Sequence, residues 1–189
     1  TLGGLRATSQ MISYELALGL SFVGPILITG SMSLRDIVLA QQNIPFIVLQ
    51  PLGAIIFMIA TIAEVNRAPF DMPEAEQELT AGYHTEYSGM KFALFFMAEY
   101  IKMIAVSTIG ATLFLGGYYG PFVEQLPWLG PIYLIAKVVI LLYGLIWIRA
   151  TLPRIRYDRL MAFGWKILFP LALLNVVLTA FGVVIFGGK

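Results

Sequence analysis

Long apolar segments separated by short polar stretches dominate the hydrophobic pattern of this chain. Each approaches the roughly 20 residues that an α-helix needs to cross a hydrocarbon core about 30 Å thick. They predict membrane-spanning helices near 11–30, 45–64, 91–115, 131–149 and 165–186. The pattern therefore predicts an all-α fold: a polytopic transmembrane bundle of about five spanning helices, forming a single membrane domain.

Local breaks in this pattern predict irregularities in the first two helices. Pro25 follows Gly24 and predicts a kink or a local unwinding, and Pro51 predicts a disturbance at the start of the second helix. Between them, SLRDIVLAQQ (33–42) has apolar residues at helical spacing. This segment is expected to form a short helix along the membrane interface.

The basic residues indicate an orientation, because Lys and Arg gather in the cytoplasmic loops of membrane proteins. If the helices alternate in direction, most basic residues share one side, namely Arg6, Arg67, Lys91, Arg149, Arg154, Arg156, Arg159 and Lys166. Arg35 and Lys189 fall on the other side. The chain is therefore expected to be a multi-pass protein in membrane lipid. Its acidic segment 64–91 and its basic segment 149–166 are both expected to face the cytoplasm.

Composition excludes several classes of function. The chain is 59% hydrophobic and 12% charged, has no Cys and has a single His. It is not expected to hold an iron–sulfur cluster, a bis-His haem or an ordinary zinc ion alone. It lacks a glycine-rich phosphate loop, and its net charge of +1 gives no indication of nucleic-acid binding. We predict no metal site and no catalytic residue of its own.

The stretch AEVNRAPFDMPEAEQELTAGYHTEYSGMK (63–91) concentrates carboxylates between two apolar runs, namely Glu64, Asp71, Glu74, Glu76, Glu78 and Glu86. Asp71 followed three residues later by Glu74 predicts the start of a short helix, which Gly82 would end. On that helix Glu74 and Glu78 share one face, and their mutual repulsion would favour proton exchange. The segment is either a solvated acidic helix or a site of proton handling or partner docking.

The helix predicted at 91–115 contains charged residues within an otherwise apolar span. Counted from Phe92, Glu99 lies about 10 Å and Lys102 about 15 Å along the helix axis. Each charge disfavours insertion by about 2.5–3.5 kcal/mol, so accidental placement is unfavourable. At i,i+3 the two can form a static ion pair or a titrating pair in a proton path. Glu15 and Glu64 would extend a chain of carboxylates toward the acidic segment.

Two basic features have alternative interpretations. Lys137 lies toward the outer end of its predicted helix and either extends its ammonium to the membrane surface or has a functional role. The basic run 149–166 is largely explained by topology, and could also bind an acidic partner or anionic lipid.

Three motifs resemble one known family, the H subunits of the proton-pumping NADH–quinone oxidoreductase, respiratory complex I. They are EVNRAPFDMPEAEQELTAGYHTEYSGMKFALFFMAEY (64–100), GLRATSQMISYE (4–15) and RATLPRIRYDRLMAFGWK (149–166). The resemblance extends over essentially the whole chain. The sequences of the motifs resemble bacterial members of the family more than mitochondrial ones. It implies a bacterial inner-membrane protein that acts as one component of a translocase.

The resemblance also implies roles for individual residues. In that family the protein forms much of the membrane-side wall of the quinone tunnel, and its acids link quinone reduction to a proton pathway. Matching positions assign the proton path to Glu15, Glu64, Glu78, Glu86 and Glu99, and the i,i+3 spacing adds Lys102 beside Glu99. They assign the tunnel or coupling loop to Arg67, Phe70, Asp71, Glu74 and Glu76. They assign contact with the peripheral arm to Arg149, Arg154, Arg156 and Asp158.

Partners and cofactors follow from the same resemblance. Quinone would be the substrate, while NADH, FMN and the iron–sulfur clusters would belong to partner subunits. The expected partners are the hydrophilic-arm subunits, including the one with the quinone-proximal cluster, and the small membrane subunits. The family normally has further N-terminal helices, so the chain is interpreted as a fragment of a longer protein.

Three alternatives to this function remain open. The chain could be the equivalent component of a membrane-bound hydrogenase or a related ferredoxin-linked ion-pumping complex, which uses the same fold without quinone. It could be an independent cation antiporter that uses Glu99 and Lys102. It could also be a purely structural anchor for a hydrophilic arm.

Overall fold

The computed structural model describes the chain except residues 1, 67–68, 71–87, 124, 154 and 187–189. Its elements are α1 (Leu2–Thr29), α2 (Leu34–Ala40), α3 (Phe46–Leu49), α4 (Pro51–Glu64), α5 (Met90–Phe114), α6 (Leu129–Thr151), α7 (Tyr157–Phe163), the π-helix η2 (Gly164–Leu168) and α8 (Phe169–Phe186). Every regular element in the described part is a helix, and the predicted all-α bundle is confirmed.

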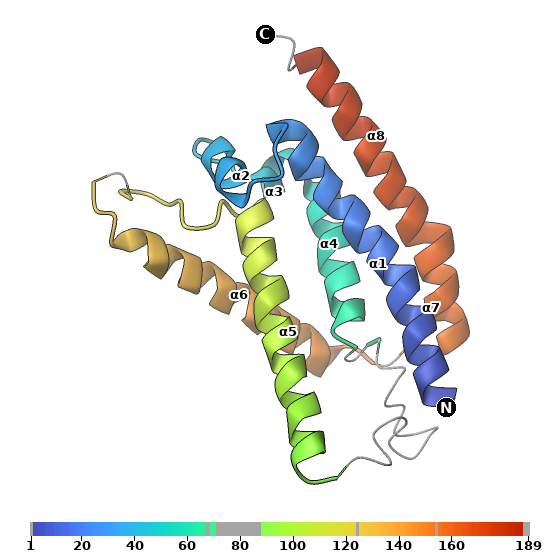
Figure 1. Ribbon diagram of the computed structural model, residues 1–189. Coiled ribbons are helices and arrows are strands. Elements are labelled where there is room, and N and C mark those ends of the chain that lie inside the picture. The colour runs from blue at the N-terminus through green and yellow to red at the C-terminus, as the bar shows by residue number, and fades with distance from the viewer. Residues whose placement is uncertain (1, 67–68, 71–87, 124, 154, 187–189) are drawn as a thin grey trace.

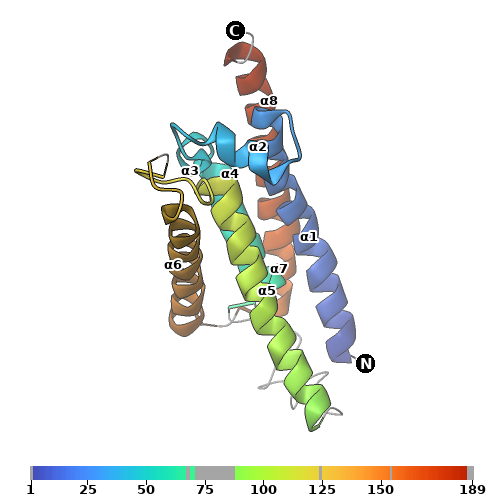
Figure 2. The same cartoon turned by 60° about the vertical axis from the view of Figure 1, so that its left-hand side comes forward.

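The bundle is built around α1, which packs against α4 on one side and α8 on another. Helix α5 joins α6 to this group, and Figure 2 shows α6 standing apart from α1 and α8 with α5 between them. The faces of α5 and α6 that point away from the core are apolar and exposed. Such faces are stable next to lipid, and the helices therefore fit a membrane-embedded bundle.

Among the described residues, four helical segments are long and apolar enough to cross a membrane: Gly4–Thr29, Met90–Phe114, Leu129–Thr151 and Tyr157–Ile185. The fifth predicted segment, 45–64, instead divides into α3 and the 14-residue α4. Gln50 takes a non-helical conformation between them, and Pro51 starts α4, where its missing N–H needs no partner. The predicted disturbance at Pro51 is confirmed, and α4 alone spans only about 21 Å.

Helix α1 runs through Pro25 without a break, so the alternative of local unwinding is wrong there. The proline removes one backbone hydrogen bond, but its ring is fully buried among neighbouring helices, which hold the helix together. The short helix predicted within 33–42 is present as α2 and lies across the end of the bundle opposite the N-terminus (Figure 1). Gln41 fixes it there, because its amide nitrogen donates to Thr112 O of α5.

The last predicted span, 165–186, begins earlier than expected. Helices α7 and α8 join through η2 into one continuous helical segment that starts at Tyr157. A single π-turn within an α-helix inserts one extra residue and is frequent at functional sites. Here it contains Trp165, which faces α1 across a hydrogen bond described below.

Candidate functional site

The end of α4 lies inside the bundle rather than at its rim. Its last turn contacts Gln10, which is about 12 Å along α1 from Leu2, and Lys102, which is about 18 Å along α5 from Met90. Figure 1 shows α5 continuing well past the end of α4. The chain therefore leaves its helix between two long neighbours, where exposed backbone would be costly in a membrane.

Gln10 compensates for this break in helical hydrogen bonding. Its side chain is fully buried, and Nε2 donates to the carbonyl oxygens of Ala63 at 3.0 Å and Phe70 at 2.8 Å. It thus joins the last turn of α4 to the segment that follows. Asn66 turns the chain with φ of 55°, a conformation that Asn tolerates better than most residues. Non-helical backbone at this depth is typical of functional sites in membrane proteins.

An ion pair lies at the same break. Lys102 Nζ of α5 is 2.6 Å from Glu64 Oε1, the side chain of the last residue of α4. Glu64 is 13% exposed and Lys102 34%. The second carboxylate oxygen, Oε2, is buried and has no hydrogen-bond partner among the described residues. A buried carboxylate oxygen in that condition is a favourable acceptor for a water molecule or a proton.

Further polar atoms accompany the pair. Thr61 Oγ1, one turn before Glu64 on α4, and Ser107 Oγ on α5 are buried, and neither has a partner within the described part of the chain. Native interiors pair most buried polar atoms, so such atoms call for an explanation. Together with Glu64 they supply hydroxyl and carboxyl groups on the two helices that the ion pair joins.

A second set of contacts holds α7 and η2 against α1. Tyr14 Oη donates to Leu160 O at 3.0 Å, and Trp165 Nε1 donates to Ser13 Oγ at 3.1 Å. The Tyr14 ring packs on Phe70 with ring centroids 5.7 Å apart. The segments that follow α4 and α6 also meet, because Ile155 N donates to Pro69 O at 3.0 Å.

The structure brings together only some of the residues that the sequence singled out. Glu64 and Lys102 are in contact, and Glu99 lies half-buried one turn from Lys102 on α5. Glu15 is exposed on α1, on a different face from Gln10. Phe70 is 6% exposed and belongs to the core with Tyr14.

The predicted docking residues lie near the ends of α6 and α7. Arg149 is half-buried in the last turn of α6. Arg156 Nε and Asp158 Oδ2 are 3.5 Å apart, and both side chains are largely exposed. The remaining predicted site residues lie outside the described part of the chain, namely Arg67, Asp71, Glu74, Glu76, Glu78, Glu86 and Arg154.

Lys137 forms hydrogen bonds with backbone carbonyls near the end of α5. Its Nζ donates to the carbonyl oxygens of Leu115 at 2.6 Å, Gly117 at 2.9 Å and Tyr119 at 2.6 Å. These carbonyls lie at and just beyond the end of α5, where helices leave acceptors without partners. The ammonium therefore caps α5, and both interpretations of Lys137 offered by the sequence stay predictions.

Sequence reasoning missed Gln10, Ser13, Tyr14 and Trp165 as site residues. Gln10, Ser13 and Tyr14 recur with Ala17 at spacings of three and four, which places them on one helix face. Polar side chains on one face of an apolar helix indicate helix–helix hydrogen bonding and were the available signal. Within the described residues, no group of three or more His, Cys, Asp or Glu side chains could hold a metal ion.

The fold and the Glu64–Lys102 ion pair define a polytopic helical membrane protein with a polar site between its helices. The family described as NADH dehydrogenase matches residues 1–180. The H subunit of the NADH-quinone oxidoreductase of Protochlamydia amoebophila is 56% identical over 180 residues, which cover 95% of this chain and 54% of the relative. The H subunit of the Dehalococcoides mccartyi strain CBDB1 enzyme is 53% identical over 184 residues, covering 97% and 50%.

A third relative, the H subunit of the Thermomicrobium roseum enzyme, is 54% identical over 188 residues and covers 94% of this chain and 54% of its own length. The chain belongs to the family of NADH-quinone oxidoreductase H subunits. It spans about half the length of the curated relatives that it matches.

Proposed function

We propose that this chain acts within the membrane arm of a proton-translocating NADH:quinone oxidoreductase. It forms part of the quinone-tunnel wall and couples quinone reduction to proton translocation. Family membership supports the assignment, and NADH and quinone are taken as the substrates because they stand in the name of the relatives. The redox groups, iron–sulfur clusters and FMN, belong to hydrophilic-arm partners, and small membrane subunits flank this one. The acidic segment 64–91 and the basic segment 149–166 lie on the cytoplasmic side of a bacterial inner membrane.

The Glu64–Lys102 ion pair is the observation on which the coupling proposal rests. In a low-dielectric interior, attraction between such charges is several times stronger than in water. A charge change in the segment after α4 alters the field at Glu64 directly, because Glu64 is the residue where that segment begins. The pair is thus positioned to respond to chemistry in the acidic segment and to pass the response to α5.

Lys102 has a second carboxylate within reach along its own helix. Glu99 lies three residues earlier on α5, on the same side of the helix. When Glu64 gains a proton, its attraction for Lys102 falls, and the ammonium shifts toward Glu99. The two arrangements form a two-state element that neighbouring membrane subunits can sense. Protonation of Glu64 and movement of Lys102 along α5 are the proposed coupling step.

The test is Glu99→Gln in the complete complex, measured as quinone reductase activity and proton pumping in membranes. The proposal predicts a loss of pumping-linked activity in a complex that assembles normally on a native gel. Asp36→Asn is the matched control, because Asp36 is an exposed carboxylate on α2 that bonds Ser31. Normal coupled turnover in Glu99→Gln would reject the shift of Lys102 toward Glu99.

A further inference from the structure

Two basic side chains at the start of the last helical segment have no role in the proposed function. Arg159 of α7 and Lys166 of η2 are both exposed. Neither side chain forms a hydrogen bond or an ion pair with another described residue. The carboxylate next to Arg159, that of Asp158, instead contacts Arg156, with Oδ2 3.5 Å from Nε. Both cations therefore remain available to a partner from outside the chain.

The two cations lie on the outward face of this segment. Leu160 and Leu168 mark its inward face, because both are buried in the core that α1 and α4 share. Arg159, Ala162 and Lys166 are spaced by three and four residues, which places them on one helix face, and all three are exposed. The small side chain of Ala162 leaves open surface between the two longer ones.

Lys166 lies at the level where lipid headgroups meet the hydrocarbon core. The 20 residues that follow it, 167–186, reach the end of α8 without any Asp, Glu, Lys or Arg. They span about 30 Å, which is the thickness of the hydrocarbon core. Trp165, beside Lys166, is 48% exposed, and its ring N–H donates to Ser13 Oγ at 3.1 Å. Tryptophan is enriched at this level of membrane proteins, which supports the same depth.

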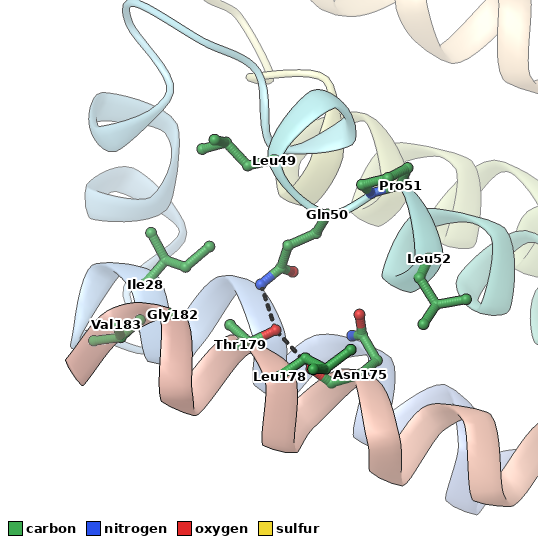
Figure 3. Close-up of a pocket in the computed structure, with 10 residues that line it drawn as sticks. All are labelled: Ile28, Leu49, Gln50, Pro51, Leu52, Asn175, Leu178, Thr179, Gly182 and Val183. Atoms are coloured by element: carbon green, nitrogen blue, oxygen red, sulfur yellow. Dashed lines mark hydrogen bonds between the residues drawn. The ribbon is translucent and has the colours of Figure 1, made fainter. Parts of the chain in front are cut away.

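The outward side of α8 is apolar. Its polar side chains face the bundle: Asn175 is 5% exposed, and Thr179 Oγ1 accepts a hydrogen bond from Gln50 Nε2 at 3.1 Å (Figure 3). The exposed side chains in the turns that follow the two cations include Ile167 and Leu171. An alkyl chain can therefore lie along the helix directly next to a headgroup bound at its start.

The charges restrict which headgroup fits. Arg159 and Lys166 are about 10 Å apart along the helix axis, and their long side chains can converge on one group that lies over Ala162. A phosphate diester offers the guanidinium two oxygens and the ammonium a compact negative charge. A choline or an ethanolamine group would bring a further positive charge close to the two cations, which is unfavourable.

We propose that this face binds the phosphate of an anionic phospholipid such as phosphatidylglycerol. The phosphate lies over Ala162 between Arg159 and Lys166, and one acyl chain runs along Ile167 and Leu171. A lipid presents its phosphate at the depth of Lys166. An acidic protein segment would have to bring carboxylates to the edge of the hydrocarbon core, where they lose hydration.

The test uses phosphatidylglycerol with a diazirine in one acyl chain, photolysed with the complete complex in vesicles of dioleoylphosphatidylcholine. The proposal predicts saturable labelling of peptides from α7, η2 and α8, about tenfold stronger than with the matching phosphatidylcholine probe. Unlabelled dioleoylphosphatidylglycerol should compete, and inorganic phosphate should not. Concentrated KCl should weaken the labelling, because it screens exposed charges.

Substitutions separate this site from the general attraction of a basic surface. Arg159→Gln and Lys166→Gln should each weaken labelling about fivefold, and the double variant about 25-fold. Ala162→Glu places a negative charge between the two cations and should abolish the preference for phosphatidylglycerol. Lys91→Gln is the matched control: it removes one exposed cation from the start of α5, at the same end of the bundle (Figure 1), and should not change this labelling.

Four outcomes would overturn the proposal, provided that native gels show an assembled complex. Equal labelling by the two lipids would mean that the phosphatidylglycerol charge is not recognised. Absence of labelling by either lipid would mean that another polypeptide covers this face. Full labelling in the double variant would mean that the lipid binds elsewhere. An equal loss in Lys91→Gln would mean that the overall surface potential, and not this pair of cations, attracts the lipid.

Discussion

Lys102 of α5 and Glu64 at the end of α4 meet inside the bundle, with Nζ 2.6 Å from Oε1. The contact joins two helices at the point where one of them stops. Removing one partner of a buried ion pair leaves an uncompensated charge, which typically lowers stability by about 3–5 kcal/mol. Glu64 is mostly buried but Lys102 is one-third exposed, so a smaller loss is expected here.

Gln10→Leu is predicted to loosen the junction after α4. The substitution removes both hydrogen bonds from Nε2, so Phe70 O loses this donor, while Ala63 O keeps only the longer bond from Asn66 N at 3.3 Å. A buried carbonyl that loses its donor lowers stability by about 1–3 kcal/mol. Denaturant titration of the purified protein in detergent measures the change. Thr8→Val, which alters an exposed hydroxyl of the same helix, should shift the midpoint little; equal shifts would contradict the assigned role of Gln10.

Lys137→Met is predicted to destabilise the end of α5. Three carbonyls lose a charged donor, which destabilises the protein. The unfavourable free energy of placing a charge in the membrane is also removed, so the two effects partly cancel. A net loss of about 2 kcal/mol is expected from those two opposing terms. Lys137→Arg keeps the charge and donors and should lose less. A methionine variant as stable as the parent would show that the capping contacts contribute nothing net.

Gly110→Ala is predicted to disturb the packing of α5 on α4. The new Cβ would lie 2.6 Å from Phe57 Cε1, in a ring that is 2% exposed and held by Phe22 and Phe114. Overpacking of this kind lowers stability by about 1–3 kcal/mol. Gly144→Ala adds the same methyl in open space and serves as the control. The proposed close approach of the two helices would be refuted by two variants with the same unfolding midpoint.

The sequence predicted most of the elements but only part of the site. Helical spacing found α2, and Pro51 marked the break before α4, because both signals are local. Pro25 gave the wrong indication of local unwinding, since burial against other helices maintains α1 there. Local rules fail where packing between distant segments decides the outcome.

The partners of the two intramembrane lysines show the same limit. Spacing along one helix offers Glu99 to Lys102, but only the packing of α4 on α5 brings Glu64 within 2.6 Å. The depth at which α4 ends is a property of the bundle, and no motif encodes it. Lys137 likewise meets the carbonyls at the end of α5 only because α6 packs beside that helix.

The most direct test of the coupling proposal is the number of protons translocated per quinone reduced, in vesicles whose complex has Glu64→Gln, Lys102→Met or both. If the pair lies on the coupling path, each single variant lowers the ratio sharply, and the double variant falls no further than the worse single one. Native gels confirm assembly in each case. A ratio at the parental value in an assembled Glu64→Gln complex would contradict the account and leave the pair as a static brace between α4 and α5.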